Sequence, residues 1–380
     1  MFCLHEKPGS SSDLNLAEAS TLSEGVRRAT ETFNESFALQ ALSRVVDFIR
    51  ANDRRLESVS KSSLYLPRLL SLYMESRKVI EKALELTCLL ATSQENALAL
   101  GKSCCDLLVT VLRTYISHPN VIQWGCKCVK LLAEAEANVP HFSKNESCDA
   151  LTAILEAYGA SDETIAEWGC KAIFILSRRS EKMQMRFGMR TCRLIVENIL
   201  KSEVHKNSII VKASVTAAVG ALAYENSANR RYFMDSGACW IILKLLELSY
   251  AVGPDYVTTC AYCICNVAEG DSNWQYQFHN WGAVSTLLKA VQTHSDISHV
   301  CVQCFRALRS LSHDSVLVRE ELISLRGCDV IVQTLRKHTN HVSAMEWGFS
   351  LVSSLADYRP TFQSLHHAGI FECLVEAFRR

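Results

Sequence analysis

Proline and glycine are scarce in this sequence, which has 6 prolines and 15 glycines among 380 residues. Both residues break helices, so their scarcity allows long helical segments. The alternation of apolar and polar residues that is typical of strands is nowhere sustained. Apolar residues instead recur at spacings of three and four, as in Val79, Ala83 and Leu86. The sequence therefore predicts an all-α fold.

An excess of charge of one sign is also missing, because 40 Lys and Arg residues balance 40 Asp and Glu residues. Proteins that hold nucleic acids or anionic membranes mainly by their phosphate groups carry positive charge, so we expect neither partner. No uncharged apolar run of about 18 residues occurs, and the first residues, MFCLHEKPGS, are too polar for a secretory signal. We therefore expect a cytoplasmic protein without a membrane span.

A repeat with a period of 42 to 46 residues runs through most of the chain. Its marker is a Leu or Val that closes an apolar helical stripe. Seven positions before the marker several units carry a small residue, such as Gly125, Gly169 or Gly348, which would let neighbouring helices approach closely. The markers are Leu90, Leu132, Leu176, Leu222, Val267, Leu311 and Leu355.

Each unit predicts a long helix, a short connection and, after a glycine, another amphipathic helix. GACWIILKLLEL (237–248) and CAYCICNVAEG (260–270) resemble the second and third helices of the armadillo family. The Trp-Gly-Cys units are closer in style to the armadillo region of leucine-rich-repeat kinases and related protist proteins than to nuclear-import adaptors. The resemblance implies an armadillo/HEAT-like α-solenoid, a right-handed superhelix of seven to eight stacked repeats.

The repeat divides the chain into three parts. Residues 1–22 include PGSSSD and few bulky apolar residues, so we predict a mobile N-terminal tail. A helix should begin at Ser23, and residues 23–76 should form capping helices and a degenerate repeat. Residues 77–380 should form seven armadillo-like repeats.

The 17 cysteines are interpreted as reduced thiols, since no secretory signal precedes them. Cys260, Cys263 and Cys265, with Cys301 and Cys304, superficially match the spacing of a zinc site. In the register of the repeat, however, several of them stand where other units carry Ala, Gly, Val or Leu. Packing is therefore the preferred interpretation, and a zinc-binding or redox-responsive protein is the alternative.

Motifs for catalysis are missing: the sequence has no nucleophile elbow, no Walker phosphate loop and no HExxH motif. We predict no enzyme and no cofactor. The resemblance implies a scaffold that binds other proteins along a concave groove lined by the third helices. A trafficking or transport adaptor that binds a linear acidic motif is the alternative.

In peptide-binding armadillo proteins, a Trp five residues before the marker and an Asn one residue before it grip the peptide backbone. Here only Asn266 matches, whereas Trp stands eight residues before the marker in three units. These indoles either line the groove with neighbouring cations, which would suit an acidic or phosphorylated segment, or cover the seam between repeats, each packed over the following glycine. The candidate partner-binding residues are Trp124, Lys127, Lys130, Trp168, Lys171, Arg178, Tyr262, Asn266, Arg306, Arg309 and Trp347.

Overall fold

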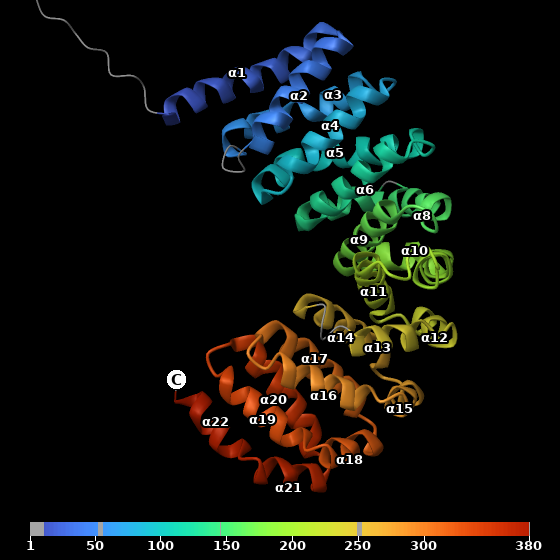
Figure 1. Cartoon of the computed structure of the whole chain (residues 1–380), viewed down its shortest axis with the longest axis vertical. Coiled ribbons are helices and arrows are strands. Elements are labelled where there is room, and N and C mark those ends of the chain that lie inside the picture. The colour runs from blue at the N-terminus through green and yellow to red at the C-terminus, as the bar shows by residue number, and fades with distance from the viewer. Residues whose placement is uncertain (1–10, 52–55, 145, 249–252, 380) are drawn as a thin grey trace, which may run out of the picture. The chain divides into compact units, whose positions relative to one another are not determined.

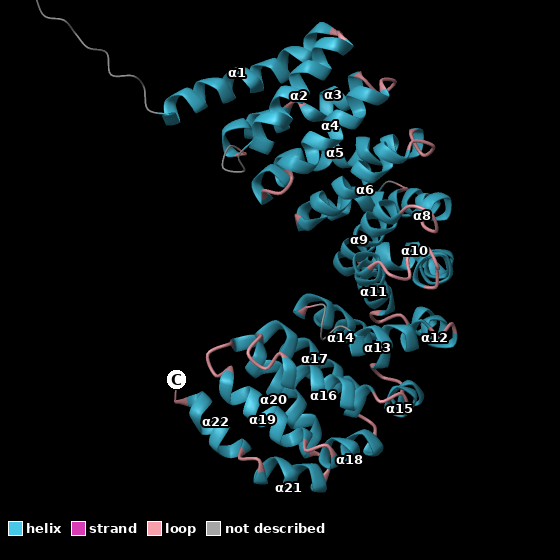
Figure 2. Cartoon of the chain, in the orientation of Figure 1, coloured by secondary structure: helices cyan, strands magenta, loops and turns pink. Residues whose placement is uncertain are grey.

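The computed structural model describes residues 11–51, 56–144, 146–248 and 253–379. These residues form helices, turns and loops and no strand, which confirms the all-α class (Figure 2). The chain divides into two compact units, Met1–Phe187 and Gly188–Arg380. We call them the N-terminal and the C-terminal unit and describe each by itself.

The helices of the N-terminal unit follow one another as labelled in Figure 1. The last of them, α10, kinks at Gly188, where φ is +58° and the two units divide. The helices are α1 (Ser11–Thr32), α2 (Glu35–Ala51), a 3₁₀ helix (Glu57–Leu64), α3 (Leu66–Leu72), α4 (Arg77–Leu90), α5 (Gln94–Thr114), α6 (Pro119–Glu134), a 3₁₀ turn (Glu136–Asn138), α7 (Val139–Lys144), α8 (Ser147–Tyr158), α9 (Glu163–Arg179) and α10 (Glu181–Arg193).

The C-terminal unit repeats a pattern of one long helix and two shorter ones. It begins with the end of α10, which a π-helix over Leu194–Leu200 follows. The others are α11 (Ile209–Ala223), α12 (Ser227–Asp235), α13 (Ala238–Leu248), α14 (Pro254–Ala268), α15 (Ser272–Asn280), α16 (Ala283–Thr293), α17 (Ser298–Ser312), α18 (Val316–Ser324), α19 (Gly327–Lys337), α20 (Val342–Ala356), α21 (Arg359–His367) and α22 (Ile370–Phe378).

Every marker residue of the repeat is fully buried in a long helix, which we call the third helix of its unit. Consecutive third helices pack against each other. In the N-terminal unit they are α4, α6 and α9, and in the C-terminal unit α11, α14, α17 and α20 (Figure 1). The predicted helical stripe thus forms a continuous core within each unit.

A polar side chain from the next short helix caps several third helices. The side-chain amides of Asn138 and Asn229 donate to the carbonyls of Leu132 and Leu222, at 3.0 and 2.9 Å. The Thr361 hydroxyl donates to the carbonyl of the marker in α20 in the same way. All three capping side chains are buried, so they satisfy carbonyls that would otherwise lack a partner at the helix end.

Helix α1 begins at Ser11 and not at the predicted Ser23. Ala19, Leu22 and Val26 are buried and continue one helical stripe, on which α1 packs against α2. Residues 11–22 of the predicted tail are therefore helical. The prediction missed them because polar residues before Ser23 conceal the apolar stripe in the sequence. Residues 1–10 lie outside the described part of the chain.

The glycine seven residues before the marker is required by close packing in α6. A Cβ atom at Gly125 would overlap Leu112 of α5, which is itself fully buried and has little room to move. We expect Gly125→Val to lower the free energy of unfolding by about 1–3 kcal/mol. Gly25→Ala is the control, because its Cβ would meet only the Ala41 Cβ at 3.9 Å, and it should stabilise α1. Thermal unfolding measures both, and equal changes would contradict the packing argument.

Candidate functional site

In each unit, the partly exposed side chains of the third helices form a surface that we call the third-helix face. In the N-terminal unit it carries alternating indoles and ammonium groups. Lys127 Nζ of α6 lies 5.2 Å from the centroid of the Trp124 ring and 5.1 Å from that of Trp168 in α9. Lys171 Nζ lies 4.5 Å from the Trp168 ring. Two tryptophans and two lysines thus form one cation–π ladder across two repeats.

The ladder decides where the indoles lie. Trp124 and Trp168 are half-buried, and Lys127 reaches from one third helix to the next across the seam between them. The side chains nearest to where a Cβ would stand at Gly125 and Gly169 are Leu112 and Leu155. The indoles therefore line the third-helix face at the seam, with cations beside them.

The C-terminal unit contains a pair in the same register. Arg306 Cζ of α17 lies 4.7 Å from the ring of Trp347 in α20. Like Lys127 and Trp168, these residues stand five positions before one marker and eight before the next. Sequence reasoning named all four residues and missed their pairing. The signal was a cation in one unit followed by a Trp in the next.

Two of the three candidate lysines are paired with carboxylates. Lys130 Nζ lies 2.6 Å from a carboxylate oxygen of Glu134, and Lys171 Nζ lies 2.5 Å from one of Glu167. Lys127 makes no ion pair with any described residue. It is therefore the uncompensated cation at the centre of the ladder.

The remaining candidates differ in their exposure. Arg178 is exposed, and its guanidinium lies 5.8 Å from the Phe174 ring. Arg309 is half-buried in α17. In α14, Tyr262 packs closely on Gly220 of the preceding third helix.

Asn266 does not belong to the accessible surface. Its side chain is fully buried, and its Nδ2 donates to the Gly220 carbonyl at 2.9 Å. The amide therefore joins α14 to α11 and is out of reach of a partner. The match to the peptide-gripping asparagine was a match of position alone.

No protein-family model matches this sequence, and the search of curated proteins found no match. Solved structures are similar to it. One engineered protein aligns with 97% of this chain and 87% of its own, at a TM-score of 0.74 and 14% identity. A designed armadillo repeat protein solved with the peptide (KR)4 aligns with 66% of this chain and 98% of its own, at 0.54 and 15%. A second designed armadillo repeat protein aligns with 65% and 99%, at 0.54 and 18%.

The chain has an armadillo-like repeat fold. Identities this low show the fold alone, so a closer likeness to the armadillo region of leucine-rich-repeat kinases rests on sequence style. In this chain, the cation–π ladder lies on the third helices of the armadillo-like repeats.

The cysteines pack between the armadillo-like helices. Every cysteine that the structure describes is buried as a free thiol. Burial raises the pKa of Cys126 to about 12 and that of Cys301 to about 11, and it raises the pKa of Cys260 well above its ordinary value. Among the described residues no three His, Cys, Asp or Glu side chains are grouped to hold a metal ion. Cys260 and Cys304 are fully buried in α14 and α17.

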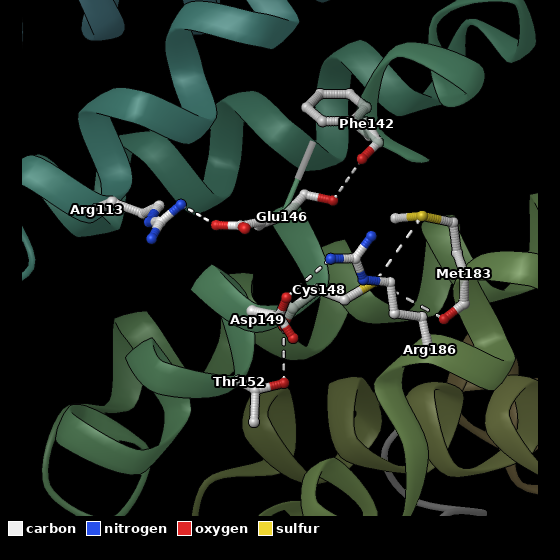
Figure 3. A network of polar contacts seen from close by, with 9 residues as sticks. Arg113, Phe142, Glu146, Cys148, Asp149, Thr152, Met183 and Arg186 are labelled. Carbon is white, nitrogen blue, oxygen red and sulfur yellow. Dashed lines mark hydrogen bonds and ion pairs between the residues drawn. The ribbon is translucent and has the colours of Figure 1, made fainter. Parts of the chain in front are cut away.

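Figure 3 shows one such thiol among polar contacts of the N-terminal unit. Cys148 Sγ of α8 donates to the Met183 carbonyl of α10 at 3.7 Å. Beside it, Arg186 binds the Asp149 carboxylate at 2.9 Å. The Cys148 thiol therefore packs between α8 and α10, beside the ion pair of Arg186 with Asp149.

Within the described residues, no helix is both long and apolar enough to span a lipid bilayer.

Proposed function

We propose that this protein is a non-enzymatic scaffold in the cytoplasm that binds other proteins along its third-helix face. The cation–π ladder of Trp124, Lys127, Trp168 and Lys171 carries this proposal. Tryptophan is among the residues that dominate binding hot spots, and both indoles are half-buried and held in place by lysines before a partner arrives. The face corresponds to the concave groove of armadillo proteins, and residues 77–380 would supply its repeats.

The partner segment would be acidic or phosphorylated. Lys127 has no carboxylate of its own, and an anion from a partner would form a charge-assisted hydrogen bond with it while contacting the two indoles. The peptide (KR)4 in the designed relative is basic, and cations at this ladder would repel such a peptide. A trafficking adaptor that holds a linear acidic motif would use the same residues.

Reversing two charges of the ladder tests the proposal. We expect Lys127→Glu with Lys171→Glu to weaken binding of the native partner about ten-fold or more, because both ammonium groups become carboxylates. The partner is identified by affinity capture with the unaltered chain, and its dissociation constant is then measured by titration. Circular dichroism should show unchanged helicity, since the side chains are partly exposed.

The control is Lys61→Glu with Lys182→Glu, which makes the same change in net charge at exposed positions away from the ladder. Binding should remain as in the unaltered chain. An equal loss in both double variants would show only a long-range charge effect. Unchanged binding in the ladder variant would exclude the ladder as the binding site.

A further inference from the structure

A hollow of about 550 Å³ opens in the C-terminal unit, away from the third-helix face. It is lined by the end of α10, by α12 and by the start of α15. Its volume is within the range of small-ligand sites, roughly 300–1,000 Å³. Its polar and aromatic lining includes Arg193, Ser227, Arg231, Tyr232, Asp271 and Trp274.

Two guanidinium groups line this hollow. Arg193 and Arg231 are exposed, and neither makes an ion pair with a described residue. The Asp271 carboxylate caps α15 and faces the positive end of that helix, because its Oδ1 accepts from the backbone N–H groups of Asn273 and Trp274 at 2.9 and 3.1 Å. The other acidic residue of the lining, Asp235, lies in the last turn of α12.

The start of α12 also lines the hollow, and Arg231 lies midway between Ser227 and Asp235. This helix has nine residues and begins at Ser227, whose hydroxyl lines the hollow. The backbone dipole adds partial positive charge at the start of α12. The Tyr232 hydroxyl is less available to an anion, because it donates to a Glu197 carboxylate oxygen at 3.4 Å. That carboxylate also pairs with Lys201. An anion is therefore the complementary ligand.

The Trp274 side chain indicates which kind of anion would fit the hollow. The half-buried Trp274 ring lines the hollow and stacks on no other described aromatic ring or cation. A ligand that presents an aromatic ring to Trp274 and a doubly charged group to both arginines would use all of these features. Arginine pairs suit phosphate because each guanidinium can donate two parallel hydrogen bonds.

We propose that this hollow binds a phosphotyrosine side chain of a partner protein. Arg193 and Arg231 hold the phosphate, and Trp274 contacts the ring. The site uses none of the residues of the cation–π ladder, so it stands or fails separately from the function proposed above.

The test uses the full chain and three synthetic peptides of one sequence, which carry phosphotyrosine, tyrosine or phosphoserine at the same position. Calorimetric titration should show the phosphotyrosine peptide binding at least ten-fold more tightly than either of the others. Equal binding of the tyrosine peptide would overturn the role of the phosphate. Equal binding of the phosphoserine peptide would overturn the role of the ring.

A variant locates the site. Arg193→Gln with Arg231→Gln should reduce phosphotyrosine binding at least ten-fold, whereas Arg359→Gln, an exposed arginine at the start of α21, should leave it unchanged. Thermal unfolding of each variant should match that of the unaltered chain, because all three arginines are exposed. Binding that survives in the double variant, or that falls equally in the control, would overturn the assignment.

Discussion

Raising the pH above about 9 is expected to unfold this protein. An unfolded cysteine has a pKa of about 8.5, whereas burial raises the pKa of Cys126, Cys104 and Cys192 to about 12 in the folded chain. Most other described cysteines have pKa values raised by the same cause. Below pH 8.5 the thiols are neutral in both states, so their contribution to stability is fully present.

Between the two pKa values, only the unfolded state loses these protons. Each such thiol then costs about 1.4 kcal/mol of stability per pH unit. Several thiols acting together exceed the usual total stability of about 5–15 kcal/mol within one or two units. We therefore expect an unfolding midpoint near about pH 10.

The measurement follows helicity by circular dichroism and thiolate absorbance near about 240 nm between about pH 8 and 11, with a reductant present. Thiolate should appear together with the loss of helix. Cys126→Ala with Cys170→Ala removes two buried thiols and should move the midpoint to higher pH. Thiolate that appears near about pH 8.5 while the helices remain intact would contradict burial as the cause.

The second large effect is expected from Leu176→Ala in α9. Leu176 is a marker residue, is fully buried, and lies in the helix that packs on α6. Removing its branched end leaves a cavity, and such changes cost about 2–5 kcal/mol. Leu98→Ala makes the same chemical change at a position that is 47% exposed and should cost much less.

Stacked repeats interact mainly with their neighbours, so the damage should be local. Hydrogen exchange of backbone amides should accelerate in α9 and in the adjoining α6, and far less in α17 of the C-terminal unit. Chemical denaturation measures the loss of stability. A loss no larger than that of Leu98→Ala would show that the marker does not carry the core.

The helical period could be predicted because it depends on spacing within one helix. Residues such as Leu132 and Leu222 recur at fixed distances from small residues, and each lies buried in a third helix as the pattern requires. The beginning of α1 was missed because polar residues outnumber Ala19 and Leu22 there. The division into capping helices with a degenerate repeat (residues 23–76) and seven repeats (residues 77–380) stays a prediction.

The candidate surface could be predicted only in part. Trp124 and Trp168 were recognised as unusual, and the choice between groove and seam stayed open because it depends on the rotation of one helix against the next. Asn266 matched a known position, yet burial and the bond to Gly220 remove it from the surface. The hollow beside Arg193 and Arg231 left no local motif at all.

The sequence by itself determined that this chain is helical, that it repeats, and which side chain closes each repeat. These properties follow from apolar spacing along single helices, which local chemistry sets. Only the tertiary structure decided that Lys127 lies over two indoles and that Arg306 lies over Trp347. The contacts of Lys127 with Trp168 and of Arg306 with Trp347 join residues one repeat apart, and they depend on how closely small side chains allow neighbouring helices to pack.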